Sequence, residues 1–205
     1  MNLLSILCIG NQSSVSIMIN GKIKDTYKTD EEFSHSKALP TYIDRLIKEN
    51  KISLLDFDGI AISIGPGSYT GLRIGLSLAK GLAFSHDIPI IPISSFDILD
   101  YSIKNKKSSY WICIHSHKNL FFSQKYDKSK ITKGPILLNI SDIKNETTYY
   151  SGRKPDLYDS PFHSYCNLDS ETIITIAKFN FNSLKINDIN SISPLYITDF
   201  TIKND

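Results

Sequence analysis

A glycine-rich segment, SIGPGSYTGLRIGLSLAKG at residues 63–81, constrains the fold of this chain more than any other feature. It follows an apolar run at 57–64 that has the length of a buried strand, and it continues into a helical pattern over 70–86. A glycine inside a helix costs about 1 kcal/mol relative to alanine, so Gly75 and Gly81 need a compensating reason. Every fourth residue from Gly67 to Ala83 is small, which indicates a helix with one side built for close packing.

These glycines do not match the common phosphate-binding loops. A dinucleotide fingerprint needs an acidic residue at the end of the following strand, whereas the strand predicted here ends in Ser94 and Ser95. A P-loop requires Gly-Lys-Ser/Thr, and this chain has Gly71-Leu72-Arg73. We therefore interpret the stripe of small residues as a packing surface. The sequence leaves open whether it packs on the protein's own sheet or on a partner helix, because the helix is apolar on nearly every side.

The remaining periodicity predicts an α/β fold of two lobes. Three antiparallel strands open the chain, and two of them are joined at Asn20-Gly21, a dipeptide typical of tight hairpin turns. A strand, turn and strand pattern repeats after a polar segment at 105–109, which we interpret as a weak internal duplication. We place an N-terminal lobe at 1–104 and a diverged C-terminal lobe at 105–205. Helices are expected at 36–50, 70–86, 96–104 and 172–179, and later strands at 57–64 and 88–94, the last of these at a sheet edge.

Composition limits the function classes. The 205 residues are 41% hydrophobic, enough for a globular core, and the net charge of +2 is too small to predict nucleic-acid or membrane binding by this chain alone. Three widely spaced cysteines (Cys8, Cys113 and Cys166) fit free thiols in a reducing compartment. No run approaches the ~20 apolar residues of a membrane span. We expect a cytoplasmic protein that does not bind membranes.

Two segments carry a family resemblance. The run from Gly65 to Gly75, followed by AKGLA at 79–83, resembles the signature of the bacterial TsaB family, also called YeaZ. The segment at 34–50, with His35 and Pro40, resembles the first helix of that family, and 193–200 resembles its C-terminal segment. The resemblance is close over about 33–100 and at the tail, and loose over 101–190. It implies an actin-like (ASKHA, RNase-H-like) fold of two lobes, each opening with an antiparallel β-hairpin in a mixed sheet.

The resemblance also implies a function without catalysis. TsaB-like proteins dimerise with the TsaD enzyme through the two helices of the N-terminal lobe. Together with a TsaE-like ATPase, that complex transfers a threonylcarbamoyl group to the adenosine next to the anticodon of tRNA. We accordingly expect no catalytic residue, cofactor or metal, and an indirect contact with tRNA. The sequence leaves open whether the same apolar face also pairs with itself in a homodimer when the partner is absent, because both kinds of pairing need it. The partner-binding residues expected by this analogy are Leu39, Ile43, Ile47, Thr70, Gly71, Arg73, Gly75, Leu76, Ala79, Lys80 and Ala83.

The chain departs from the family at two turns. Gly10 stands where the first strand usually ends in a carboxylate, the remnant of a site for phosphate and magnesium in actin-like ATPases. Without that carboxylate a metal-bound nucleotide loses its usual anchor. This argues against the alternative function, an autonomous actin-fold kinase or ATPase. The family's Asp-Ala-Arg turn in the second lobe is replaced by His115-Ser116-His117.

Other candidate chemistry is weak. His35 has Leu39, not a second histidine, four residues on, so we interpret it as a structural residue that bonds local backbone. His115 and His117 are expected on one face of a strand, with no third metal ligand nearby in sequence. Ser68 lacks the Gly-x-Ser-x-Gly pattern of a nucleophile elbow.

Overall fold

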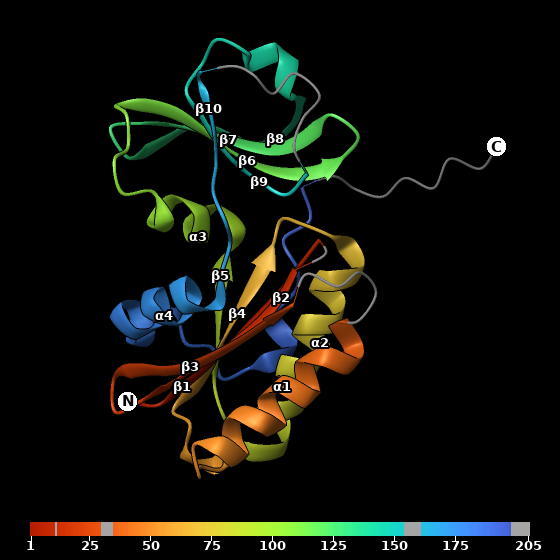
Figure 1. The fold of residues 1–205 in the computed structure, drawn as a ribbon, viewed down its shortest axis with the longest axis vertical. Coiled ribbons are helices and arrows are strands. Elements are labelled where there is room, and N and C mark those ends of the chain that lie inside the picture. The colour runs from red at the N-terminus through yellow and green to blue at the C-terminus, as the bar shows by residue number, and fades with distance from the viewer. Residues whose placement is uncertain (11, 30–34, 154–160, 198–205) are drawn as a thin grey trace, which may run out of the picture.

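The computed structural model describes residues 1–10, 12–29, 35–153 and 161–197, and these form two five-stranded sheets, one in each lobe of Figure 1. The first has the order β3-β2-β1-β4-β5 and the second the order β10-β9-β6-β7-β8. The strands of the first sheet are β1 (Leu3–Ile9), β2 (Gln12–Ile19), β3 (Lys22–Thr29), β4 (Gly59–Gly65) and β5 (Ile90–Ser94). Those of the second are β6 (Ser109–His117), β7 (Leu120–Asp127), β8 (Lys130–Asn139), β9 (Thr148–Ser151) and β10 (His163–Tyr165).

The two sheets have the same connectivity, so the predicted duplication is confirmed. In each, three antiparallel strands come first, and the next two strands add in parallel beside the first strand of the set. The predicted hairpin turn is also confirmed, because Asn20 and Gly21 both have positive φ, 53° and 73°. Strand β5 lies at the edge of its sheet, as its prolines predicted.

Helices cover both faces of the first sheet (Figure 1), namely α1 (His35–Glu49) and α2 (Tyr69–His86) on one face and α3 (Ser95–Ser102) and α4 (Ser170–Leu184) on the other. Strand β1 is buried on both faces and alternates between them: Leu4 and Ile6 pack with α1 and α2, while Leu3 and Leu7 pack with α3 and α4. Short 3₁₀ turns complete the described elements, η1 (Leu54–Asp56), η2 (Ile140–Ile143) and η3 (Ile189–Ser191).

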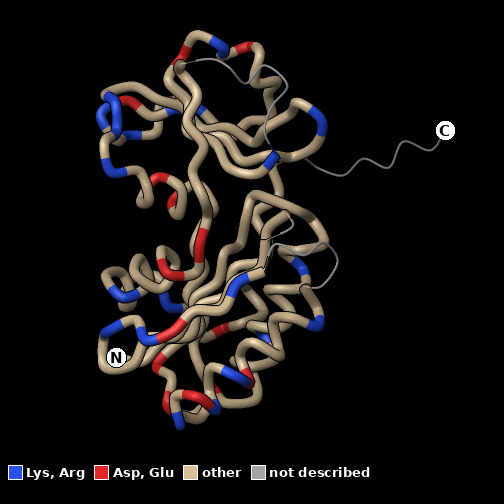
Figure 2. Tube along the Cα trace, viewed as in Figure 1, with Lys and Arg blue, Asp and Glu red and all other residues tan. Residues whose placement is uncertain are grey.

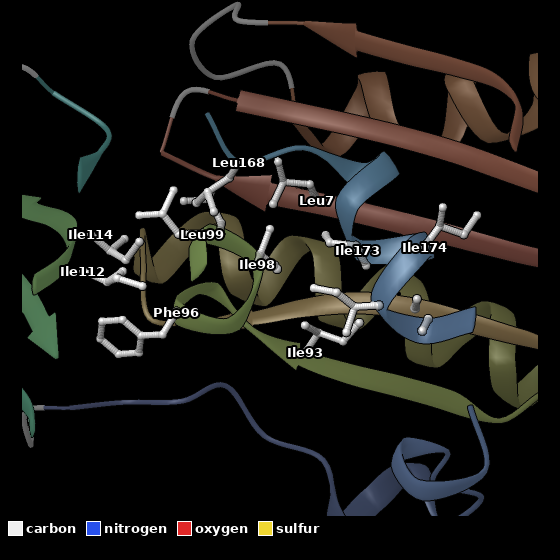
Figure 3. Close-up of a cluster of buried hydrophobic side chains, with 14 of the residues drawn as sticks. Leu7, Ile93, Phe96, Ile98, Leu99, Ile112, Ile114, Leu168, Ile173 and Ile174 are labelled. Carbon is white, nitrogen blue, oxygen red and sulfur yellow. The ribbon is translucent and has the colours of Figure 1, made fainter. Parts of the chain in front are cut away.

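A single hydrophobic cluster joins the lobes. Figure 3 shows α3 between the two sheets, with Phe96 and Leu99 on one side close to Ile112 and Ile114 of β6. On the other side α3 meets Ile93 of the first sheet in the same cluster. The lobes therefore share core residues, and their relative position is held by buried apolar contact.

The end of the chain corrects the predicted domain division. Helix α4 lies beyond residue 104, but it packs on the first sheet: the hydroxyl of Ser5 donates to the carbonyl of Ser170 over 2.7 Å, and Lys178 donates to the carbonyl of Gly21 over 2.9 Å. Residues after α4 continue along the same lobe, where the amide of Leu195 donates to the carbonyl of Ile64. A single domain boundary after residue 104 therefore assigns α4 to the wrong lobe, because the chain returns to the first sheet.

The predicted stripe of small residues faces the protein's own sheet. A Cβ added at Gly71 would lie 3.0 Å from the carbonyl oxygen of Cys8, and one added at Gly75 would lie 2.9 Å from the Cβ of Cys8. Ala79 and Ala83 are fully buried behind them. The sequence left open whether the stripe packs on the protein's own sheet or on a partner helix, and the structure shows the first. Helix α2 approaches β1 so closely that a side chain in place of Gly71 or Gly75 would collide with the strand.

Gly81, in contrast, is exposed and has nothing within 4 Å of an added Cβ. We expect Gly75→Ala to lower the free energy of unfolding by about 1–3 kcal/mol, because overpacking against β1 outweighs the gain in helix propensity. Gly81→Ala, in the same helix, should raise it by up to about 1 kcal/mol. Urea unfolding of the two variants beside the wild type measures both effects. Equal effects of the two substitutions would contradict the packing described for α2.

Candidate functional site

The structure separates the eleven expected partner-binding residues into two groups. Seven are buried within the N-terminal lobe and are therefore corrected from surface to core: Leu39, Ile43, Gly71, Gly75, Leu76, Ala79 and Ala83. Thr70 and Arg73 are exposed, and Ile47 and Lys80 are half-buried. The physical reason is periodicity, because residues four apart along the glycine stripe share one side of α2, and that side covers β1 and β4.

The outer side of α2 forms a second surface. Ile74 and Leu78 are half-buried there and line a groove of about 370 Å³ between α1 and α2, together with Ser36, Pro40, Arg73 and Ser77. Further along, the side chain of Phe84 is 80% exposed. An aromatic ring left this open adds exposed apolar area to the same helix, and exposed apolar area of this kind is typical of an interaction surface. We call the outer residues of α1 and α2, with this groove, the helix-pair face.

Small residues also mark the helix-pair face. Ser77, Gly81 and Ser85 follow each other at intervals of four and are all exposed. Gly81 is the glycine that internal packing does not explain, since nothing lies within 4 Å of an added Cβ. Sequence reasoning missed Phe84 and did not assign a side to Gly81. The sequence did contain one signal for this surface: a glycine in the middle of a helix lowers helix stability, so Gly81 calls for a reason that internal packing does not supply.

The start of α2 is fixed to the C-terminal segment. The guanidinium of Arg73 stacks on the ring of Tyr69, 3.8 Å from its centroid, and Arg73 Nε donates to the hydroxyl of Tyr196 over 3.1 Å. The two tyrosine rings lie 5.4 Å apart. Ser68 caps the helix by accepting from the amide of Gly71, which is a structural role. Arg73 is thus exposed yet held in one position, at the rim of the groove.

A cavity of about 490 Å³ lies between the lobes, beside the turn after β1. The turn after β1, the start of α2 and the ends of β6 and β9 surround it. Its described lining residues are Ile9, Gly10, Gln12, Ser68, Ile114, His115, Ser116, Ser151, Gly152, Arg153, Tyr165 and Leu168. No carboxylate is among them, and without one these residues offer a magnesium ion no strong ligand.

His35 supports the turn beside this cavity. Its Nε2 lies 2.9 Å from the carbonyl of Gly10, which can only accept, so Nε2 carries the proton and Nδ1 accepts from the hydroxyl of Ser13. Both side chains are buried, so this serine and histidine cannot reach a substrate. The predicted contact of His35 with local backbone is wrong, because its partners are the carbonyl of Gly10 in the β1–β2 turn and the hydroxyl of Ser13 in β2.

The histidines of β6 make separate contacts. His115 Nε2 lies 3.0 Å from the carbonyl of Lys118, while His117 Nδ1 lies 3.0 Å from the hydroxyl of Ser116, and the register shifts between the two residues. Burial, and then the nearby charge of Arg153, lower the pKa of His115. Within the described residues no three histidine, cysteine or acidic side chains gather as a metal site. All three cysteines are free thiols, as predicted.

Comparison with known proteins gives the family. The model of the TsaD family, tRNA N6-adenosine threonylcarbamoyltransferase, matches residues 31–143. The TsaB protein of Haemophilus influenzae, a tRNA threonylcarbamoyladenosine biosynthesis protein, is 37% identical over 82 residues, which cover 40% of this chain and 34% of the relative. The Bacillus subtilis TsaB is 43% identical over 74 residues, covering 36% of this chain and 32% of the relative. The matched part thus spans about a third of these relatives.

Structural comparison confirms the expected fold. A crystal structure from Pseudomonas aeruginosa, of a protein with similarity to peptidase YeaZ, superposes with a TM-score of 0.79 at 18% identity and covers 96% of this chain and 99% of the other. The described residues of the loosely resembling region, 101–153 and 161–190, therefore keep the same architecture although their sequence has diverged. No helix in the described ranges is long and apolar enough to cross a membrane.

The cavity generates one prediction about nucleotide. Because its described lining lacks a carboxylate, magnesium should not strengthen any binding of ATP to the isolated chain. Calorimetric titration of ATP should give the same weak or absent signal with excess MgCl₂ and with EDTA. Saturable binding that appears only with magnesium would contradict this and would favour the kinase or ATPase alternative.

Proposed function

The chain belongs to the TsaD family, with the TsaB (YeaZ) proteins, and on that premise we propose that it is a docking subunit for threonylcarbamoyl transfer to tRNA. In this proposal a TsaD-like subunit carries out the transfer to the adenosine next to the anticodon, and this chain contributes no catalytic group. A TsaE-like ATPase joins through the complex. A role in tRNA modification carries with it the cytoplasmic location expected from free cysteines.

One observation carries the proposal: apolar side chains remain exposed on the helix-pair face, although the core of the lobe is already packed. The inner side of α2 is fully used by the sheet. The outer side nevertheless offers the groove between α1 and α2 and the ring of Phe84. Exposed aromatic groups beside small residues let a second helix pair approach and bury its own apolar side chains.

The four exposed or half-buried residues of the original set remain in the proposal. Thr70 and Arg73 lie at the start of α2, with Arg73 lining the groove, while Ile47 lies on α1 and Lys80 further along α2. The position of Arg73, held between Tyr69 and Tyr196, presents its charge without the entropy cost of ordering a free side chain on binding. The buried residues of the set act indirectly, by holding α1 and α2 in place.

The same surface suits a homodimer. A two-fold pair would place the helix-pair face of one copy on that of another, because such an interface uses one patch on both subunits. We propose that the homodimer and the complex with a TsaD-like subunit compete for this face. The homodimer would then dissociate as the partner is added.

A pair of matched variants tests the docking proposal. Phe84→Ser combined with Gly81→Gln removes the exposed ring and fills the open side of α2 without touching the core. The proposal expects the affinity for a TsaD-like subunit from the same cell to fall at least about 30-fold, as for loss of an interface hot spot. Sedimentation or surface-binding measurements report the affinity, and thermal melting confirms that the fold is kept.

The control changes the opposite helix layer. Phe179 on α4 is 70% exposed, and Ser183 is exposed on the same helix. Phe179→Ser with Ser183→Gln is therefore a change of the same kind away from the helix-pair face. Normal affinity of this control beside a weakened Phe84→Ser, Gly81→Gln variant supports the proposal. Equal affinities of the two variants would contradict it.

A further inference from the structure

Basic residues are concentrated in one part of the second lobe. Residues 104–133 contain eight lysines and one acidic residue, whereas the rest of the chain has fifteen basic and twenty acidic residues. The small net charge of +2 therefore conceals a strongly positive segment within an otherwise negative chain. Figure 2 shows the corresponding blue segments gathered mainly at the left end of the upper lobe.

The fold brings these lysines together from separate elements. The β7–β8 hairpin carries Lys125, Lys128, Lys130 and Lys133. The loop before β6, which includes Lys104 and Lys107, lies against the hairpin turn, where the amide of Lys128 donates to the carbonyl of Ser108 over 2.7 Å. We call the surface made by these residues the lysine surface: Lys104, Lys107, Lys125, Lys128, Lys130 and Lys133.

Little negative charge offsets this surface. Within the described residues, the ion pairs nearby are Lys125 with Glu146 at 2.5 Å and Lys106 with Asp100 at 2.6 Å. Burial alone would raise the pKa of Glu146, but hydrogen bonds from Lys125 and Trp111 outweigh it and lower that pKa. The carboxylate of Glu146 is therefore already bonded to Lys125 and Trp111. Lys104, Lys107, Lys128, Lys130 and Lys133 have no carboxylate within 4 Å among the described residues.

Two features of the hairpin are unfavourable for the isolated protein. Lys125 and Lys133 stand directly opposite each other on β7 and β8, where like charges repel, and the carboxylate of Glu146, which interacts with both lysines, offsets part of that repulsion. At the turn, Lys128 and Ser129 have φ of 46° and 62°, a conformation that favours glycine and asparagine. The equivalent turn of the first lobe has the same backbone and uses Asn20-Gly21. The second lobe thus places a lysine where its own duplicate has an uncharged, better suited residue.

Protection of the sheet edge explains only part of the pattern. Strand β8 is an edge strand, and lysines there discourage pairing with another chain. That function accounts for Lys130 and Lys133. It does not account for Lys104, Lys107 or Lys128, which lie outside β8.

We propose that the lysine surface binds the phosphate backbone of the tRNA substrate, a direct contact of this chain with RNA. The inference rests on the proposed function, which brings the chain to a tRNA. Exposed ammonium groups without carboxylate partners replace the counterions of a phosphate backbone, and they do so without reading the base sequence. The lysine surface is separate from the helix-pair face, so both can be occupied at once.

The test neutralises three lysines without weakening the fold. The variant combines Lys128→Asn with Ser129→Gly, which copies the turn of the first lobe and should stabilise the hairpin, and adds Lys107→Gln and Lys130→Gln. The control has Lys22→Gln, Lys24→Gln and Lys28→Gln on β3, the equivalent edge strand of the first sheet. Both variants lose three positive charges. Binding of a tRNA transcript that reads codons beginning with A is measured from 50 to 300 mM salt, on the complex and on the chain alone.

The lysine surface predicts that the slope of log K against log salt becomes smaller by about 3 in the variant and stays unchanged in the control. Binding at 100 mM salt should weaken at least about tenfold in the variant. An unchanged slope would overturn the inference. So would an equal weakening of assembly with the TsaD-like subunit before tRNA is added, because the lysines would then form a protein interface. Failure of the wild-type chain to assemble counts against the docking proposal alone.

Discussion

The approach of α2 to β1 determines what the rest of this molecule can offer to a partner. Gly71 and Gly75 allow the helix so close to the strand that an added Cβ would meet Cys8 at 3.0 or 2.9 Å. That contact sets the distance between α2 and the sheet, and it leaves the side of α2 opposite Gly71 and Gly75 facing away from the sheet. Because α1 packs in the same layer, the two helices present one continuous outer surface with a groove between them. The interaction face is thus a consequence of internal packing.

Because the two sheets share one topology, equivalent positions in the two lobes can be compared directly. Both lobes use the same strand order and the same hairpin backbone. The first lobe keeps an uncharged turn and leaves apolar helix surface open. The second carries the lysines. Between them lies a cavity whose described lining lacks a carboxylate.

Much of the fold could be predicted from the sequence because its signals are local. Each of three patterns predicts the element in which it occurs: the Asn20-Gly21 dipeptide a hairpin turn, the prolines of β5 an edge strand, and the helical periodicity the helices. The return of α4 to the first sheet could not be predicted, since it depends on contacts such as Ser5 with Ser170 across 165 residues. The side of α2 that faces the sheet was also undecided, because small residues recur at intervals of four on both sides. Only the neighbours of each glycine distinguish Gly75 from Gly81.

The central claim is that this chain acts by docking through the outer side of α1 and α2. Hydrogen–deuterium exchange of the chain, alone and saturated with a TsaD-like subunit, tests it most directly. The account predicts slower exchange in peptides covering His35–Glu49 and Tyr69–His86, and unchanged exchange in those covering Ser95–Ser102 and Ser170–Leu184. Slower exchange confined to the layer of α3 and α4, or to the residues lining the cavity between the lobes, would contradict it.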